Sequence, residues 1–267
     1  MILRIVSSVI MAGAAILLTG AGTLPFAGLV AGVASTLCWE WGRMVRKDNP
    51  TPPLVLHVAA TLFAVALSAA GEILAAMGVL FVGAVLLALT TKPALARSWS
   101  AAGAVYFGLP AVALIAMRQD AVYGIAAVLF LFTVVWGADT FAYFTGRAIG
   151  GPKLAPSISP GKTWAGLFGG VILPSAICAA AATWIGGTSP FAIALLAATL
   201  ACISQVGDLV ESYAKRQFRQ KDASHLIPGH GGFLDRVDGF IFASVAAWLF
   251  GLVRDPGHPA QALLLWP

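Results

Sequence analysis

Charge is what this sequence has least of. Only 10% of its 267 residues are Asp, Glu, Lys or Arg, and 59% are hydrophobic. Soluble domains carry roughly 25% charged residues. The composition therefore excludes an ordinary soluble domain and predicts a protein that spans a membrane. The net charge of +5 does not by itself indicate nucleic-acid binding, because basic residues also accumulate on one side of membrane proteins.

Cysteine is also scarce, and the positions of the three cysteines indicate no disulfide, metal-binding or redox role. Cys38, Cys178 and Cys202 are each inside an apolar run, without the spacing of a disulfide framework or a metal site. They are expected to act as small hydrophobic residues. The sequence also has no low-complexity linker, no internal repeat and no stretch that would form a separate soluble domain.

Long hydrophobic runs, in contrast, are abundant. A helix needs about 20 mainly apolar residues to cross a bilayer, and turns containing glycine or proline separate the runs. The first run is expected to be a retained anchor rather than a cleaved signal peptide, and the first two runs are alternatively one hairpin. The sequence predicts an all-α, polytopic integral membrane protein with about nine transmembrane helices, near residues 3–20, 24–42, 54–71, 73–91, 99–117, 121–138, 165–186, 190–207 and 237–253.

Basic residues predict the orientation of these spans, because they favour cytoplasmic loops. With a cytoplasmic N-terminus, only Arg118 and Arg254 of the 16 Lys and Arg residues fall outside, and the C-terminus is outside too. Membrane orientation thus explains the positive charge, and no nucleic-acid partner is expected. We expect a single membrane domain, residues 1–267. Residues 1–120 supply its N-terminal spans, and residues 121–267 supply the spans that carry polar motifs on the cytoplasmic face.

Acidic side chains concentrate in the polar segment 208–236 and at the start of the span after it. If the preceding span continues as a helix, residues three and four apart share one face, which then carries Asp208, Glu211, Ser212 and Lys215. Asp235 and Asp238 are again three apart. Such carboxylates can present oxygen ligands to one hard divalent cation such as Mg²⁺. The alternative is that the three aspartates only form salt bridges, with Lys215, Arg216 and Arg236.

A glycine-rich turn, residues 227–232, lies between these groups of acids. Glycine lets backbone N–H groups approach a ligand closely. Gly231 and Gly232 are therefore expected to form an anion-binding turn beside the helix that begins near Phe233. His230 either donates to an oxyanion or caps the turn.

Basic and hydroxyl side chains complete the expected site. Cations that can neutralise a polyphosphate follow the acidic face: Lys215, Arg216 and Lys221. The earlier polar segment, 139–164, offers donors to phosphate oxygens: Lys153, Ser159, Lys162 and Thr163. It is not a P-loop, because Pro156 stands where that motif has its first glycine. Asp139 either binds metal or pairs with Arg147, and Glu40 is expected to pair with Arg43.

The spacing of these residues resembles a known family. The signature of the phosphatidate cytidylyltransferases, also called CDP-diglyceride synthetases, is similar to the pattern Ser212-x-x-Lys215-Arg216, Lys221-Asp222-x-Ser224 and Ile227-Pro228-x-His230-Gly231-Gly232-Phe233-x-Asp235-Arg236-Val237-Asp238. The segments 207–212 and 153–164 resemble the same family. Two positions depart from it. Ala214 replaces a larger apolar residue, and Ala165 stands where a glutamate commonly follows Lys-Thr-Trp, which leaves the role of the 159–163 loop open.

The resemblance implies an enzyme of phospholipid biosynthesis that transfers CMP from CTP to phosphatidic acid, giving CDP-diacylglycerol and pyrophosphate. It implies Mg²⁺ as the cofactor, held by Asp208, Asp235 and Asp238. It implies catalytic roles for Asp208, Asp235, Asp238, Lys215, Arg216 and His230. It implies substrate-binding roles for Ser159, Lys162, Thr163, Lys153, Ser212, Lys221, Gly231, Gly232 and Arg236. The expected location is the bacterial inner (plasma) membrane with a cytoplasmic active site, and a homodimer is one alternative to a monomer.

Two other functions fit parts of the sequence. A CTP-dependent polyprenol or phytol kinase would share the membrane character and the nucleotide, and would differ in its lipid acceptor. A non-enzymatic transporter would need ionisable residues near the middle of its spans and broken helices in both halves. The predicted spans are nearly free of charge, and the charges gather at one interface. This distribution favours an enzyme.

Overall fold

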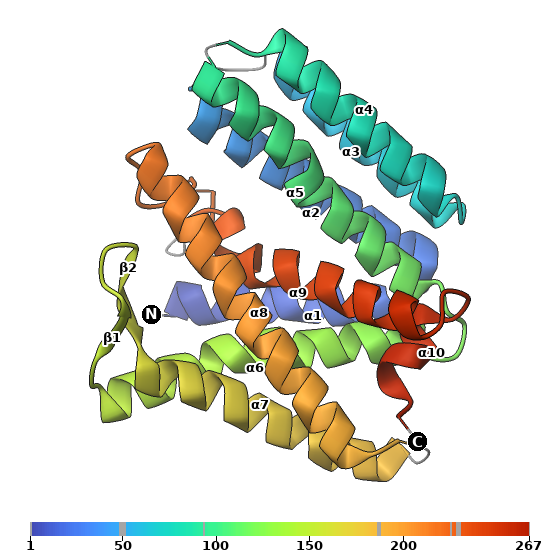
Figure 1. Ribbon diagram of the computed structural model, residues 1–267, viewed down its shortest axis with the longest axis vertical. Coiled ribbons are helices and arrows are strands. Elements are labelled where there is room, and N and C mark those ends of the chain that lie inside the picture. The colour runs from blue at the N-terminus through green and yellow to red at the C-terminus, as the bar shows by residue number, and fades with distance from the viewer. Residues whose placement is uncertain are drawn as a thin grey trace. The chain divides into compact units, whose positions relative to one another are not determined.

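The computed structural model describes residues 2–47, 52–92, 94–185, 188–224, 226–227 and 231–266, and these are mostly helical (Figure 1). The helices are α1 Ile2–Gly20, α2 Thr23–Arg46, α3 Pro52–Ala69, α4 Ile73–Thr90, α5 Ala94–Arg118, α6 Gly124–Ile149, α7 Trp164–Ile185, α8 Pro190–Gln217, α9 Leu234–Arg254 and α10 Pro259–Leu264. Two short strands, β1 Lys153–Ala155 and β2 Ser159–Thr163, lie between α6 and α7.

Seven of the described helices are long and apolar enough to cross a membrane. They are α3 to α9, and α1 contributes a shorter apolar stretch, Val6–Gly20. An all-helical, polytopic membrane protein is thereby confirmed. Each of the nine predicted spans overlaps one of the helices α1 to α9.

Several helices continue beyond their predicted ends. The polar segment that begins at residue 139 is helical as far as Ile149, and α8 runs on to Gln217. A helix keeps its backbone hydrogen bonds after the apolar run ends, since each added residue closes one more bond. The polar side chains at residues 139–149 and 208–217 therefore lie on helices.

The chain divides into two compact units. The first consists of Met1–Gln119 and Gln217–Val237, and the second of Asp120–Arg216 and Asp238–Pro267. In the first unit, α2 contacts α3 and α5, and α4 contacts both α3 and α5. Gly83 supports this packing, since a Cβ there would lie 2.8 Å from the Cβ of Ala60. Small residues at such positions let membrane helices approach closely.

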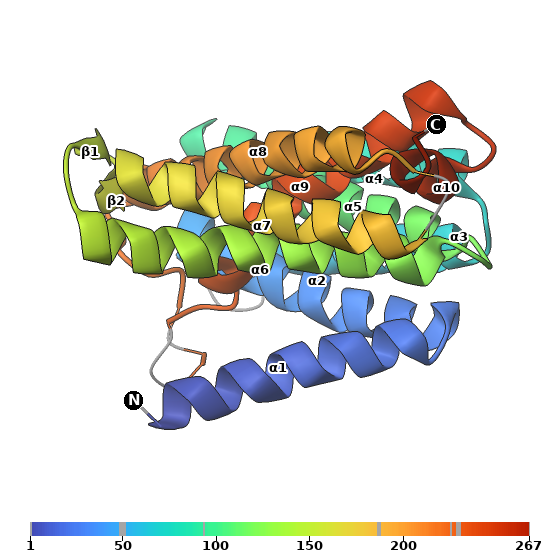
Figure 2. The same cartoon turned by 90° about the horizontal axis from the view of Figure 1, so that it is seen from below.

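In the second unit, α6 and α7 lie side by side (Figure 2). A Cβ on Gly170 would lie 2.6 Å from the Ala138 carbonyl oxygen, and one on Gly166 would lie 2.9 Å from that of Ala142. These glycines therefore allow the two helix backbones to touch.

The hairpin between α6 and α7 is antiparallel, with Lys153 opposite Thr163 and Ala155 opposite Ser159. Its second strand runs directly into α7. The Thr163 hydroxyl accepts a hydrogen bond from the Gly166 N–H at 3.1 Å and so caps the first turn of α7. The buried Thr163 thereby fixes the base of the hairpin and the position of its neighbour, Lys162.

Candidate active site

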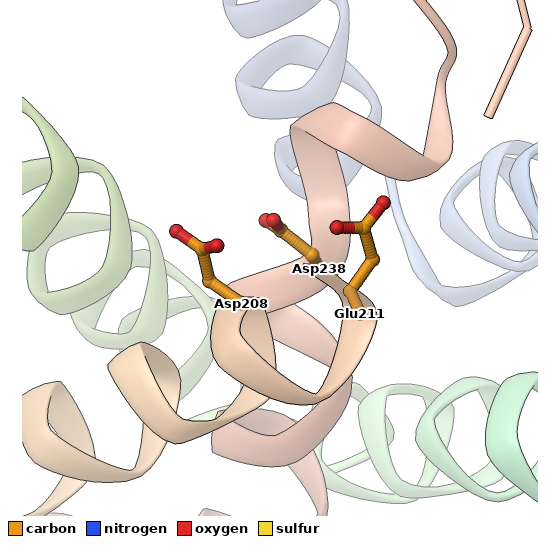
Figure 3. Close-up of side chains that lie close together, drawn as sticks. All are labelled: Asp208, Glu211 and Asp238. Atoms are coloured by element: carbon orange, nitrogen blue, oxygen red, sulfur yellow. The ribbon is translucent and has the colours of Figure 1, made fainter. Parts of the chain in front are cut away.

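Three carboxylates of the second unit come together at the junction of two helices. Asp208 and Glu211 lie one turn apart on α8, and Asp238 lies in the first turns of α9. Each offers an oxygen atom, and the three atoms lie within 4.8 Å of one another. In Figure 3 the Asp238 side chain projects between those of Asp208 and Glu211. We call Asp208, Glu211 and Asp238 the carboxylate cluster.

Glycine makes this approach of α8 and α9 possible. A Cβ on Gly207 would lie 2.9 Å from the Asp238 carbonyl oxygen and 3.2 Å from the Phe242 ring. A Cβ on Gly239 would lie 3.4 Å from the Ser204 Cβ. The absence of side chains at Gly207 and Gly239 therefore lets α8 and α9 touch beside the cluster. This contact brings Asp208 next to Asp238.

Two lysines balance part of the negative charge of the cluster. Lys162 Nζ lies 2.7 Å from Asp208 Oδ2, and Lys215 Nζ lies 2.8 Å from Glu211 Oε2. The Ser212 hydroxyl is 3.4 Å from Asp208 Oδ1, and Asp238 Oδ1 accepts a hydrogen bond from the Gly239 N–H at 2.8 Å. The three carboxylates outnumber these two lysines, and a divalent cation would relieve the repulsion among them.

A buried amide extends this network. Gln205 Oε1 accepts a hydrogen bond from Lys162 Nζ at 3.1 Å, and Gln205 Nε2 donates to Asp139 Oδ1 at 3.4 Å. Gln205 lies one turn before Asp208 on α8 and is almost fully buried. No sequence motif predicts a role for Gln205. Its signal was weak, because a single glutamine at the end of an apolar run has many uses.

In the first unit, a fully buried carboxylate on α2 holds the segment that leads into α9. Glu40 accepts hydrogen bonds from the Ser224 hydroxyl, from the Phe233 N–H at 2.8 Å and from the Leu234 N–H at 2.7 Å. The expected pairing of Glu40 with Arg43 is therefore replaced by capping of a helix N-terminus. Unpaired N–H groups and the positive end of the helix dipole attract a carboxylate there.

Asp235 has a similar task in the same segment. Its Oδ2 atom accepts hydrogen bonds from the Gly232 N–H at 2.8 Å and the Ala223 N–H at 3.1 Å. Gly231 has a φ of +84°, and a Cβ on Gly232 would lie 2.9 Å from Asp235 Oδ2. The Gly232 N–H therefore binds a carboxylate of the chain itself, and the Ile227 N–H donates to the Gly231 carbonyl at 3.0 Å. The middle of the predicted anion-binding turn, residues 228–230, lies outside the described residues.

The remaining predicted residues differ in their exposure. Ser212 and Lys215 are buried beside the cluster, and Ser159 is half-buried in β2. His230 lies outside the described residues. The cations exposed to solvent are Lys153, Arg216, Lys221 and Arg236. The spacing places Glu211 on the acidic face, and the predicted metal ligands do not include it. The structure sets Glu211 within the cluster.

The apolar helices and this charged cluster define an integral membrane protein with a polar site at the junction of helices. Comparison with known proteins gives the family. The model of the cytidylyltransferase family matches residues 2–253, and the chain belongs to that family.

Its relatives include proteins named phosphatidate cytidylyltransferase. The Brucella suis protein is 36% identical over 259 residues, which cover 96% of each chain. The Pseudomonas aeruginosa protein is 35% identical over 228 residues, covering 82% of this chain and 84% of the relative. The resemblance noted in the sequence is thereby confirmed.

Proposed function

We propose that this protein transfers CMP from CTP to phosphatidic acid and forms CDP-diacylglycerol and pyrophosphate. The observation that carries the proposal is the similarity to phosphatidate cytidylyltransferases along nearly the whole chain. The carboxylate cluster and its lysines supply the groups that such a reaction needs. The reaction places the protein in phospholipid biosynthesis.

The chemistry requires positioning and charge neutralisation rather than a protein nucleophile. A phosphate oxygen of phosphatidic acid attacks the α-phosphorus of CTP. The bond between that phosphorus and the oxygen bridging to the β-phosphate breaks, and pyrophosphate leaves with the electron pair. Negative charge builds up on the phosphates in the transition state, so fixed cations lower the barrier. Lys162 and Lys215 are the buried or half-buried ammonium groups beside the cluster.

Mg²⁺ is the proposed cofactor, and the donor set fits it. Asp208, Glu211 and Asp238 offer oxygen atoms only, and these atoms lie within 4.8 Å of one another. Hard divalent cations prefer oxygen ligands and retain room for substrate phosphates and water. Bound there, Mg²⁺ would neutralise the triphosphate of CTP. Asp235 remains a proposed ligand from the family resemblance.

The proposed arrangement in the membrane has nine spans, a cytoplasmic N-terminus and an external C-terminus. The distribution of Lys and Arg supports it, since it leaves two of 16 outside. The proposed location is the bacterial inner membrane, with the site on the cytoplasmic side, where CTP meets the lipid headgroup. A homodimer remains an alternative to a monomer.

The test is synthesis of lipid-linked nucleotide by purified protein in micelles that contain phosphatidic acid. With labelled CTP and Mg²⁺, we expect labelled CDP-diacylglycerol, and none after the metal is removed with excess EDTA. Restoring Mg²⁺ should restore the product. A folded wild-type protein that makes no product would overturn the proposal. Replacing phosphatidic acid with a prenol tests the kinase alternative, which predicts a phosphorylated prenol instead.

A further inference from the structure

Lys162 has two partners in the second unit, and they differ in charge. Its ammonium group lies 2.7 Å from the Asp208 carboxylate and 3.1 Å from the Gln205 amide oxygen. The side chains of Lys162 and Asp208 are 17% and 25% exposed. An ion pair that retains some contact with solvent is weak, and its partners can separate at small cost.

The ion pair competes directly with the use of Asp208 as a cation ligand. Asp208 Oδ2 already receives the Lys162 ammonium at hydrogen-bond distance. A divalent cation bound by the same carboxylate would repel the ammonium group at this short range. Lys162 must then move away from Asp208, while the neutral Gln205 imposes no such change.

Gln205 holds the Lys162 ammonium group near the carboxylate cluster. Its side chain is almost fully buried, and its amide nitrogen is 3.4 Å from Asp139 Oδ1. This contact orients the amide so that its oxygen faces Lys162. At its other end, Lys162 is fixed by the neighbouring Thr163, which caps α7. The lysine is therefore tethered from both sides and has little room to leave the site.

We infer that Lys162 exchanges partners during the reaction cycle. It pairs with Asp208 before the carboxylate cluster takes up a divalent cation, and afterwards its ammonium group binds the CTP phosphates while Gln205 holds it in reach. Lys162 is thus a substrate-binding residue that also weakens cation binding before CTP arrives, and Gln205 is a positioning residue. The CTP part of this inference rests on the proposed function.

The exchange can be tested by binding of Mn²⁺ alone to the purified full-length protein, followed by the EPR signal of free Mn²⁺. Lys162→Met removes the competing charge and retains the aliphatic chain. We expect it to bind Mn²⁺ roughly two- to fivefold more tightly than wild type, the range that one partly exposed ion pair is worth. Lys92→Met, the same change at an exposed lysine in the first unit, should leave Mn²⁺ binding unchanged.

The CTP assay tests the second half of the exchange. Lys162→Met should raise KM for CTP about tenfold or more, because a charged hydrogen bond to phosphate is lost. One variant would thus bind the metal more tightly and the nucleotide more weakly. Unchanged or weaker Mn²⁺ binding would overturn the competition with Asp208. Tighter Mn²⁺ binding with an unchanged KM for CTP would overturn the transfer to the nucleotide.

Gln205→Leu tests the tether. We expect KM for CTP to rise about three- to tenfold with kcat and Tm close to wild type, since only the hold on Lys162 is lost. A purely structural role would lower Tm and kcat together and leave KM unchanged, which would overturn the assignment. The Mn²⁺ measurements need neither CTP nor lipid, so they separate failure of the exchange from failure of the proposed reaction.

Discussion

Glu211 and Glu40 are both buried carboxylates, and their neighbours give them different roles. Glu211 lies beside two other carboxylates and a lysine. Glu40 is surrounded by donors, namely one hydroxyl and two backbone N–H groups. Carboxylates crowded together favour a cation, whereas a carboxylate that receives several hydrogen bonds is already satisfied. At the residue scale, Glu211 is therefore a proposed cation ligand, whereas Glu40 belongs to the scaffold.

The role of Glu211 leads to a prediction for Glu211→Gln. The substitution retains the shape of the side chain and removes one of the three negative charges of the cluster. We expect CDP-diacylglycerol synthesis to fall by about 100-fold or more, as when one fixed electrostatic group of an active site is removed. Initial rates at saturating CTP measure the loss. Glu72→Gln, at an exposed position before α4, is the matched control and should remain fully active.

The role of Glu40 predicts a different outcome. Glu40→Ala leaves the Phe233 and Leu234 N–H groups without their acceptor, which should cost about 1.5–3 kcal/mol for bonds to a charged group. We expect faster hydrogen exchange and faster proteolysis of segment 217–237 than in wild type. Exchange monitored by mass spectrometry measures this. Protection equal to that of wild type would show that Glu40 does not hold the segment.

At the scale of elements, close contacts between helices set the positions of the carboxylate cluster and its neighbours. Gly207 lies against the Asp238 carbonyl, and Gly170 lies against that of Ala138. Since a methyl group would not fit at either place, glycine is what allows α8 to meet α9 and α6 to meet α7 at these points. Hydrophobic burial does not drive such contacts within a lipid bilayer, so close packing of small residues supplies the attraction.

Gly207→Ala tests this dependence. The added methyl group would force α8 and α9 apart beside the cluster, at a cost of about 1–3 kcal/mol. We expect a lower Tm in detergent and a large loss of activity, because the carboxylate oxygens would separate. Gly78→Ala is the control, since a Cβ there meets no atom within 4 Å. Alanine favours a helix more than glycine does, so this variant should be as stable as wild type or more so.

At the scale of the whole molecule, the orientation of the helices determines whether CTP can reach the site. The proposed topology puts the β1–β2 hairpin on the cytoplasmic side and the turn after α9 outside. Cysteines introduced in a cysteine-free background distinguish the two sides. In spheroplasts, an impermeant maleimide should label Asp255→Cys, whereas Lys153→Cys should react only after the inner membrane is broken. The reverse labelling pattern would show that the proposed topology is inverted.

The helices and the family could be predicted from the sequence because both depend on local information. A run of about 20 apolar residues predicts a span wherever it occurs, and each of the nine predicted runs overlaps one of the helices α1 to α9. The family signature from Ser212 to Asp238 is a pattern of fixed spacings within one segment, and the family match confirms it. The helical ends were less predictable, since polar residues continue α6 and α8 beyond their apolar parts.

The partners of the polar residues were decided only by the tertiary structure. Glu40 caps a helix almost two hundred positions later in the chain, and Lys162 reaches Asp208 and Gln205 on α8. Spacing along one helix indicates which side chains share a face, but not which distant donor or acceptor that face will meet. Hydropathy and motif spacing thus determined the membrane helices and the family. Packing between helices remote in sequence decided which carboxylates gather in one cluster and which cap a helix, because only that packing brings the opposing groups within hydrogen-bond distance.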